Sequence, residues 1–261
     1  VSPDGQRFAC AESVAPNLQQ ALENWDTALP ALCGLAAGEG EPLAGQHIRA
    51  PLPRAWQWLD GSAFATHGTL MQIAFGLEPV SHERPLMYQG LSDKFHGPRD
   101  DVPMTDEALG IDFEGEFGVI VDAVPMGTGA EAAMDHIKLI VQINDWSLRA
   151  IAPVEMKTGF GWVQAKPACS VAPFAVTPDE LGDDWRDGRV CLDLVVDWNG
   201  KRFGAANGAD MIFGFHELVA HAARTRALLA SGRPLARALP WRLGLELRRV
   251  LAGGHRILDR I

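Results

Sequence analysis

Residues 112–121 read DFEGEFGVIV, and this stretch puts two carboxylates at the head of an apolar run. The run predicts a strand. In a strand, residues i and i+2 point to the same face, so Glu114 and Glu116 are expected to project side by side. Two like charges on one sheet face repel each other, and a cation, a proton or solvent has to relieve the repulsion. Taken alone, the pair is equally typical of the solvated face of an edge strand.

A second apolar run, Ile137 to Ile143, follows and ends in Asn144-Asp145-Trp146-Ser147. Asp145 is therefore a third carboxylate at a strand end. Three hard oxygen ligands on adjacent strands suit Mg²⁺, Mn²⁺ or Ca²⁺ better than zinc. We expect a divalent cation as cofactor, with Mg²⁺ first and Mn²⁺ or Ca²⁺ as the alternatives.

The composition is that of a folded chain: of 261 residues, 47% are apolar and 21% charged, so a packed core is expected. No apolar run approaches the roughly 18 residues of a membrane span, so no membrane partner is expected. The formal net charge of −10 argues against a nucleic-acid partner, because basic residues are not in excess to neutralise phosphates. The cysteines form no CxxC pair and are expected to be reduced thiols in a cytoplasmic protein: Cys10, Cys33, Cys169 and Cys191.

The periodicity of the chain predicts an α+β fold. Apolar residues at helical spacing predict one helix over 17–32 and another over 215–229. Asn17 is the expected N-cap of the first helix. Alternation over 190–198, followed by Asn199-Gly200, predicts a strand that enters a tight hairpin turn. The sequence from Thr177 to Glu180 has capping-box spacing and predicts a short helical turn.

Two changes of composition suggest a division into domains. A break near Pro79 to Pro85 separates a small N-terminal domain, 1–80, from a larger domain, 81–232. Residues 233–261 contain seven arginines, no lysine, one aspartate and one glutamate, so they carry +5 and the rest of the chain −15. We treat 233–261 as an atypical C-terminal segment.

With these residues assembled, the chain resembles the fumarylacetoacetate hydrolase family from about Pro51 to Ser231. The likeness is carried by residues 86–93, 112–121, 143–149 and 164–167. It implies a β-rich, roll-like catalytic domain behind a small N-terminal domain, usually as a homodimer. It also implies a small-molecule 2-oxo or 1,3-dicarbonyl acid as substrate.

The resemblance assigns roles to individual residues. Glu114, Glu116 and Asp145 match the family's metal-binding carboxylates, and Asp93 matches a further acidic ligand. Lys166 matches the lysine beside the metal, where it would hold the substrate or its enolate. The alternative for Asp93 is a simple turn residue, and for Lys166 a surface lysine.

Three further residues are candidates by the same route. Ser170 falls where the family places a hydroxyl near the metal, and we group it with Tyr88 as substrate-binding. The family's water-activating histidine aligns with Asp100 here, so His96, on a loop and out of register, is the candidate catalytic base. A solvated loop histidine is the alternative.

The resemblance ends at the C-terminus. Family members continue with a strand and a glycine-rich turn that lines the metal pocket, whereas here Ser231-Gly232 gives way to the Arg-rich segment. We state as a hypothesis that this segment arose from a shifted reading frame or a truncation.

The predicted function is a metal-dependent hydrolase that cleaves a C–C bond in an acylpyruvate or similar acid. One alternative is a 2-oxo acid decarboxylase or isomerase that uses the same site. The other is a catalytically impaired family member that lacks the C-terminal pocket strands.

Overall fold

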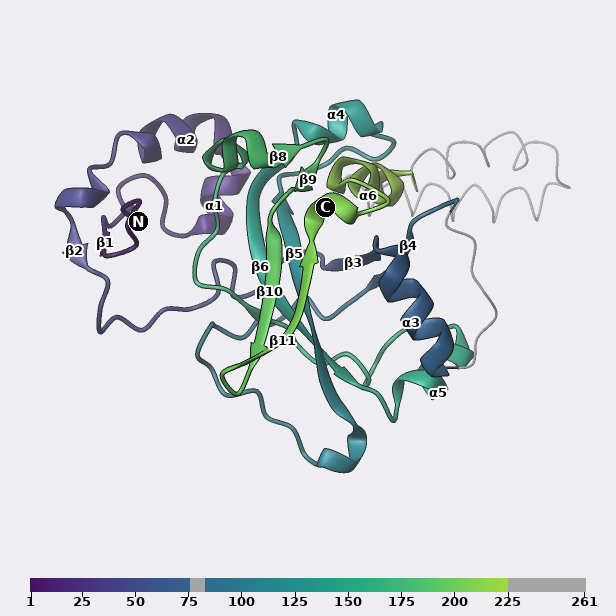
Figure 1. Ribbon diagram of the computed structural model, residues 1–261. Helices are drawn as coiled ribbons and strands as arrows, with labels where there is room; N and C mark the ends of the chain where they lie inside the picture. The colour runs from purple at the N-terminus through teal and green to yellow at the C-terminus, as the bar shows by residue number, and fades with distance from the viewer. Residues whose placement is uncertain (76–82, 225–261) are drawn as a thin grey trace, which may run out of the picture.

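The strand predicted over residues 112–121 forms β5 (Ile111–Val121), which pairs antiparallel with β6 (Ile137–Leu148) along its length. The computed structural model describes residues 1–75 and 83–224 (Figure 1). Glu114 lies opposite Asp145 and Glu116 lies opposite Ile143. Because directly paired residues share a face of the sheet, the register puts the three carboxylates on one face.

The other strands are short, except for one hairpin. They are β1 (Arg7–Phe8), β2 (Glu41–Pro42), β3 (Leu59–Ser62), β4 (Leu86–Gln89), β7 (Ser170–Val171), β8 (Trp185–Arg186), β9 (Arg189–Val190), β10 (Asp193–Trp198) and β11 (Lys201–Asn207). The helices are α1 (Leu18–Glu23), α2 (Trp25–Cys33), α3 (Ala65–Phe75), α4 (Ala130–Met134), α5 (Ala152–Thr158) and α6 (Phe215–Ala223), with 3₁₀ turns η1 (Ala37–Glu39), η2 (Glu107–Leu109), η3 (Pro178–Asp184) and η4 (Gly208–Asp210). The predicted mixed α+β class is confirmed.

Strand β6 forms the centre of the core. It pairs with β5 on one side and with β7 on the other, and its apolar residues are almost all buried. Ile137 and Ile140 pack in one cluster with Phe215 and Leu218 of α6. A second cluster gathers Val141 and Ile143 with residues of β7 and of the loop before it. Burial of each such side chain contributes about 1.5–3 kcal/mol, so the strand that carries Asp145 is anchored by the core.

The hairpin β10–β11 covers the sheet face opposite the carboxylates. Its turn has positive φ at both central residues, 51° at Asn199 and 73° at Gly200, as a primed two-residue turn requires. The predicted turn is therefore confirmed, although the strand begins at Asp193, and Val190 belongs to β9, where it pairs with Trp185 of β8. A Cβ at Gly115 would lie 2.7 Å from Val196 Cγ2, so this glycine lets β10 approach β5.

The change Gly115→Ala is expected to lower the free energy of unfolding by about 1–3 kcal/mol, because the new methyl group overpacks this contact. Gly204→Ala in the same hairpin is the matched control, since a Cβ there meets nothing within 4 Å. Urea unfolding followed by circular dichroism measures both. Equal midpoints for the two variants would show that β10 does not pack tightly on β5.

Elsewhere the helix predictions hold in part. The predicted helix over 17–32 is divided at Asn24, whose φ of −132° is not helical, into α1 and α2. Asn17 does cap α1, accepting a hydrogen bond of 3.0 Å from the Gln20 amide. The helical turn predicted at 177–180 is confirmed as η3, with Thr177 at its N-cap position, although Thr177 makes no side-chain capping hydrogen bond. Helix α6 confirms the start of the predicted helix over 215–229; residues 225–229 and the segment 233–261 lie outside the described residues.

Strand β3 and helix α3 precede the predicted domain break in the chain but join the part that follows it. Leu59–Ser62 pair with Leu86–Gln89. A Cβ at Gly61 would contact Leu218 of α6, so β3 lies against the main core. Residues 59–75 thus contribute to the same body as β5 and β6 (Figure 1). Among the described residues, no helix is long and apolar enough to cross a membrane.

Candidate metal centre and active site

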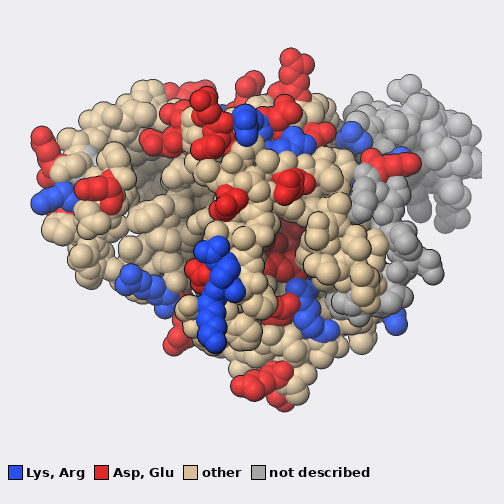
Figure 2. Space-filling view, viewed as in Figure 1, with Lys and Arg blue, Asp and Glu red and all other residues tan. Residues whose placement is uncertain are grey.

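Four carboxylates converge where β3, β5 and β6 meet. They belong to Asp60, Glu114, Glu116 and Asp145, and one oxygen from each lies within 4.8 Å of the others. The β5–β6 register sets three of them, and the pairing of β3 with β4 brings Asp60 to the same place. Asp145 is only 1% exposed. Figure 2 shows acidic side chains set back in a hollow between the β10–β11 hairpin and α3.

This donor set fits a hard divalent cation. All four groups offer carboxylate oxygens, the ligands that Mg²⁺ and Mn²⁺ prefer. The strands hold them close enough to share one ion, and their mutual repulsion is relieved when a cation binds. Asp60, Glu114, Glu116 and Asp145 are therefore the residues that would hold the metal.

Cationic side chains surround Glu114. Its Oε1 accepts hydrogen bonds from Lys166 Nζ at 3.0 Å and from Arg149 Nη2 at 2.8 Å. The Ser147 hydroxyl donates to the same oxygen at 3.3 Å. Arg149 is fixed in turn by Asp112, which accepts from its Nε at 2.8 Å. One oxygen of Glu114 thus accepts from three donors, whereas its Oε2 lies 3.8 Å from His67 Nε2.

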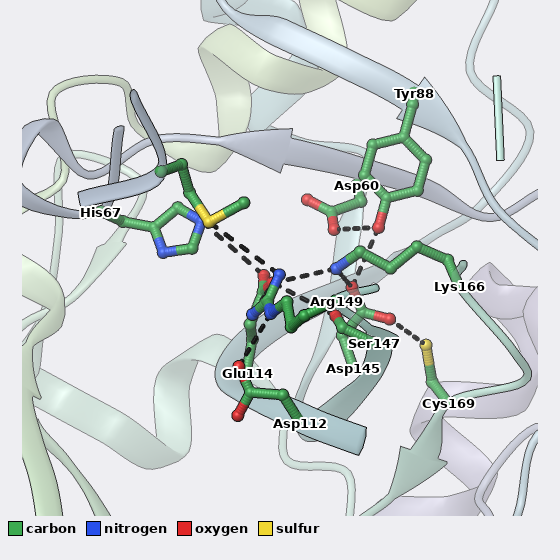
Figure 3. Close-up of polar contacts among 11 residues, drawn as sticks. Asp60, His67, Tyr88, Asp112, Glu114, Asp145, Ser147, Arg149, Lys166 and Cys169 are labelled. Atoms are coloured by element: carbon green, nitrogen blue, oxygen red, sulfur yellow. Dashed lines mark hydrogen bonds and ion pairs between the residues drawn. The ribbon is translucent and has the colours of Figure 1, made fainter. Parts of the chain in front are cut away.

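Donors also surround Asp145 (Figure 3). Its Oδ2 accepts from Lys166 Nζ at 2.5 Å and lies 2.9 Å from the Tyr88 hydroxyl. Its Oδ1 lies 3.2 Å from Cys169 Sγ, which donates to it. Tyr88 also lies 2.6 Å from Asp60 Oδ2, so its single proton is shared between two carboxylates. These contacts orient Asp145 and tie Asp60 to it.

The carboxylates differ in how readily they ionise. Burial, together with the charge of Asp145, raises the pKa of Asp60 to about 7. Burial and the charges of Asp60 and Asp145 also raise the pKa of Glu116 well above its usual range. Burial acts in the same direction on Glu114, but Lys166, Arg149 and His67 outweigh it, and the Glu114 pKa is lowered. Asp60 and Glu116 therefore hold their protons more tightly than ordinary carboxyl groups do, and a cation would compete with those protons.

Affinity for Mn²⁺ is expected to rise steeply with pH up to about 7. The folded protein keeps the Asp60 proton to about pH 7, whereas the unfolded chain loses it near the ordinary value of 3.8. The folded state thus binds more protons in this window, so Asp60 lowers stability as pH rises from about 4 to 7. Binding a cation releases the Asp60 proton, so the Kd should weaken by about tenfold for each pH unit below 7, and by more where Glu116 releases a proton as well.

Titration calorimetry between pH 5.5 and 8 measures this dependence. Asp60→Asn removes the proton and should flatten the slope while it weakens binding. A wild-type affinity that does not change with pH would contradict the assignment of Asp60 as a protonated ligand.

Helix α3 presents a histidine to the centre that the sequence analysis missed. His67 Nε2 lies 3.8 Å from Glu114 Oε2, and its side chain is 41% exposed. It is therefore open to solvent and adjacent to the carboxylates. No periodic signal in the sequence distinguishes it, since its position depends on how α3 packs beside β3.

The structure brings five of the predicted site residues together: Glu114, Glu116, Asp145, Lys166 and Tyr88. It places the other three differently. Asp93 is exposed on the loop after β4, outside the carboxylate group, and Asp60 takes the fourth place. The Ser170 hydroxyl accepts from the Trp146 indole, whose side chain lies on the opposite sheet face. His96 is buried, and burial lowers its pKa while Lys94 and Asp100 are the charges that act on it.

Comparison with known proteins gives the family. The model of the fumarylacetoacetate (FAA) hydrolase C-terminal domain matches residues 57–232, and that of fumarylacetoacetase N-terminal domain 2 matches residues 1–54. The chain belongs to the fumarylacetoacetate hydrolase family. The resemblance in the sequence is thus confirmed, together with the fold it implies.

Relatives in this family are hydrolases and isomerases. The 2,4-didehydro-3-deoxy-L-rhamnonate hydrolase of Sphingomonas sp. (strain SKA58) is 30% identical over 146 residues, which are 55% of this chain and 48% of that protein. The chain spans about half the length of the curated relatives it matches.

Solved structures agree on the fold. Maleylpyruvate hydrolase from Sphingobium sp. SYK-6, in complex with manganese(II) and pyruvate, has a TM-score of 0.56 at 17% identity, over 79% of this chain and 69% of that one. The 5-carboxymethyl-2-hydroxymuconate delta-isomerase from Mycobacterium smegmatis has a TM-score of 0.55 at 20% identity, over 71% and 68%. Both proteins thus share this fold, and their names describe a hydrolase and an isomerase.

Proposed function

We propose that the protein is a metal-dependent hydrolase that cleaves the C–C bond of an acylpyruvate or a similar 2-oxo acid. The observation that carries the proposal is the four-carboxylate centre with Lys166 and His67 beside it. Family membership supports it, because the relatives include hydrolases. We further propose Mg²⁺ as the resident ion, with Mn²⁺ as the alternative, in a cytoplasmic homodimer.

The cation, held by the four carboxylates, would supply Lewis acidity that favours the build-up of negative charge on the substrate oxygens. The protein supplies the remaining groups. Lys166 Nζ donates its hydrogen bonds within the centre, so it can hold the substrate carboxylate or the developing enolate oxygen. The buried position of Lys166, only 8% exposed, strengthens such an interaction because water does not screen it.

His67 is the group best placed to activate water. Its imidazole is open to solvent, and its Nε2 lies 3.8 Å from Glu114 Oε2, at the edge of the carboxylate group. The water oxygen bonds to the acyl carbonyl carbon as its proton passes to His67. The C–C bond then breaks, and its electron pair becomes the enolate, which takes up a proton to give pyruvate beside the released acid.

A direct assay tests the proposal. We expect acylpyruvate absorbance to fall in the presence of Mg²⁺ or Mn²⁺ and to stay constant in EDTA. Chromatography should then find two acids in equal amounts. Release of CO₂ would indicate a decarboxylase, and a single product of unchanged mass an isomerase. Equal rates with and without EDTA would exclude the metal mechanism.

Assembly is tested separately. The mass of one chain is 28.2 kDa, and light scattering after size-exclusion chromatography should give twice that mass. A monomer with full activity would remove the dimer from the proposal without touching the chemistry.

A further inference from the structure

Lys166 contacts the same carboxylates that would bind the cation. Its ammonium donates to Asp145 Oδ2 at 2.5 Å and to Glu114 Oε1 at 3.0 Å. Both acceptors belong to the group whose oxygens lie within 4.8 Å of one another. The side chain also lies along the Tyr88 ring, with Nζ 5.7 Å from its centroid. These contacts hold the ammonium within the carboxylate group.

The charges around Lys166 explain why it stays there. Arg149 also reaches Glu114, but its guanidinium is shared with Asp112. Asp60, Glu116 and Asp145 have no arginine partner among the described residues. The ammonium of Lys166 is therefore the positive charge nearest the middle of the group. Burial would disfavour the ammonium, but Glu114 and Asp145 outweigh it, and the Lys166 pKa is raised.

A divalent cation in this group would meet that charge at close range. Repulsion between charges a few ångström apart is strong where water does not screen them. Two of the hydrogen-bond acceptors of Lys166 would have to reorient toward the ion or be shared with it. Binding of the cation therefore weakens the contacts of Lys166, and the converse also holds.

On the basis of the metal centre assigned under the proposed function, we propose that Lys166 competes with the divalent cation for Asp145 and Glu114. Lys166 is then a tethered counter-ion: it stabilises the carboxylate group by itself and sets an upper limit on metal affinity. Displacement by the ion frees the ammonium for the substrate. A lysine that only binds substrate would leave the affinity for metal unchanged.

The test is the affinity for Mn²⁺ in the absence of substrate, measured by titration calorimetry on the full chain. Lys166→Met should tighten the Kd by about tenfold or more, because the repulsion is removed. The same variant should have a lower Tm without metal and a larger increase in Tm with saturating Mn²⁺. Lys138→Met is the matched control, since Lys138 Nζ lies 3.1 Å from Asp122 Oδ2 and takes no part in the carboxylate group. This variant should leave the Kd unchanged.

A second variant covers the case in which Lys166→Met does not fold. Lys166→Gln keeps a hydrogen-bond donor without the charge and should also bind Mn²⁺ more tightly than the wild type. Unchanged or weaker binding in the variant that folds would overturn the counter-ion role while the metal centre stands. A wild-type protein that binds no Mn²⁺ would overturn the proposed function itself, and this inference with it.

Discussion

The change Asp145→Asn is expected to abolish binding of the divalent cation and, with it, turnover of the acylpyruvate. Loss of an outer hydrogen-bond partner of a metal ligand typically costs about 10- to 100-fold in affinity, and loss of a ligand should exceed that. Asp145 is 1% exposed, and Tyr88, Lys166 and Cys169 all donate to it. The neutral amide removes the charge while it keeps the shape, so the effect reports on coordination.

Titration calorimetry with Mn²⁺ and the absorbance assay measure the two losses. Asp122→Asn is the matched control, because Asp122 is also a carboxylate with a lysine partner, although it is only partly buried and follows the far end of β5. It should retain both properties. Metal binding within a few-fold of wild type in Asp145→Asn would remove Asp145 from the coordination sphere.

The change His67→Gln is expected to lower kcat by about 10²- to 10⁴-fold, the usual contribution of a general base. Affinity for Mn²⁺ should change little, since His67 lies 3.8 Å from Glu114 Oε2 and is not one of the four carboxylates. This separation of kcat from metal affinity distinguishes a base from a ligand.

His96→Gln is the natural comparison, because His96 is the candidate base in the sequence analysis. We expect kcat to stay within a few-fold of wild type, since the charges acting on His96 are those of Lys94 and Asp100. Loss of kcat in the His96 variant, with full activity in the His67 variant, would reverse the assignment. Far-ultraviolet circular dichroism confirms that both variants are folded.

Three of the four carboxylates in the centre could be predicted because their positions follow from local sequence patterns. Strand alternation puts Glu114 and Glu116 on one face, and the position of Asp145 at the end of the next apolar run adds the third ligand. Side-chain period and strand pairing are short-range properties that a single sequence carries. Lys166 and Tyr88 came from the family resemblance.

What could not be predicted depends on tertiary packing. Asp60 reaches the centre only because β3 pairs with β4, a contact between segments that share no periodic pattern. At the short strand β7, neighbouring residues lie on opposite faces of the sheet. Ser170 lies opposite Asn144 and so faces away from the carboxylates, whereas Cys169, one residue earlier, reaches Asp145. A shift of one residue exchanges the faces, and composition does not reveal which side chain is inside.

Asp145 and His67 lie on elements that differ in how firmly they are anchored to the core. Asp145 lies on β6, whose other residues form the core, so its position is lost only when the core itself opens. His67 lies on α3, where Leu70 and Ile73 are 61% and 73% exposed. The proposed binding of the ion should thus be lost only with global unfolding, whereas the proposed proton transfer by His67 depends on a helix that can detach at a smaller free-energy cost.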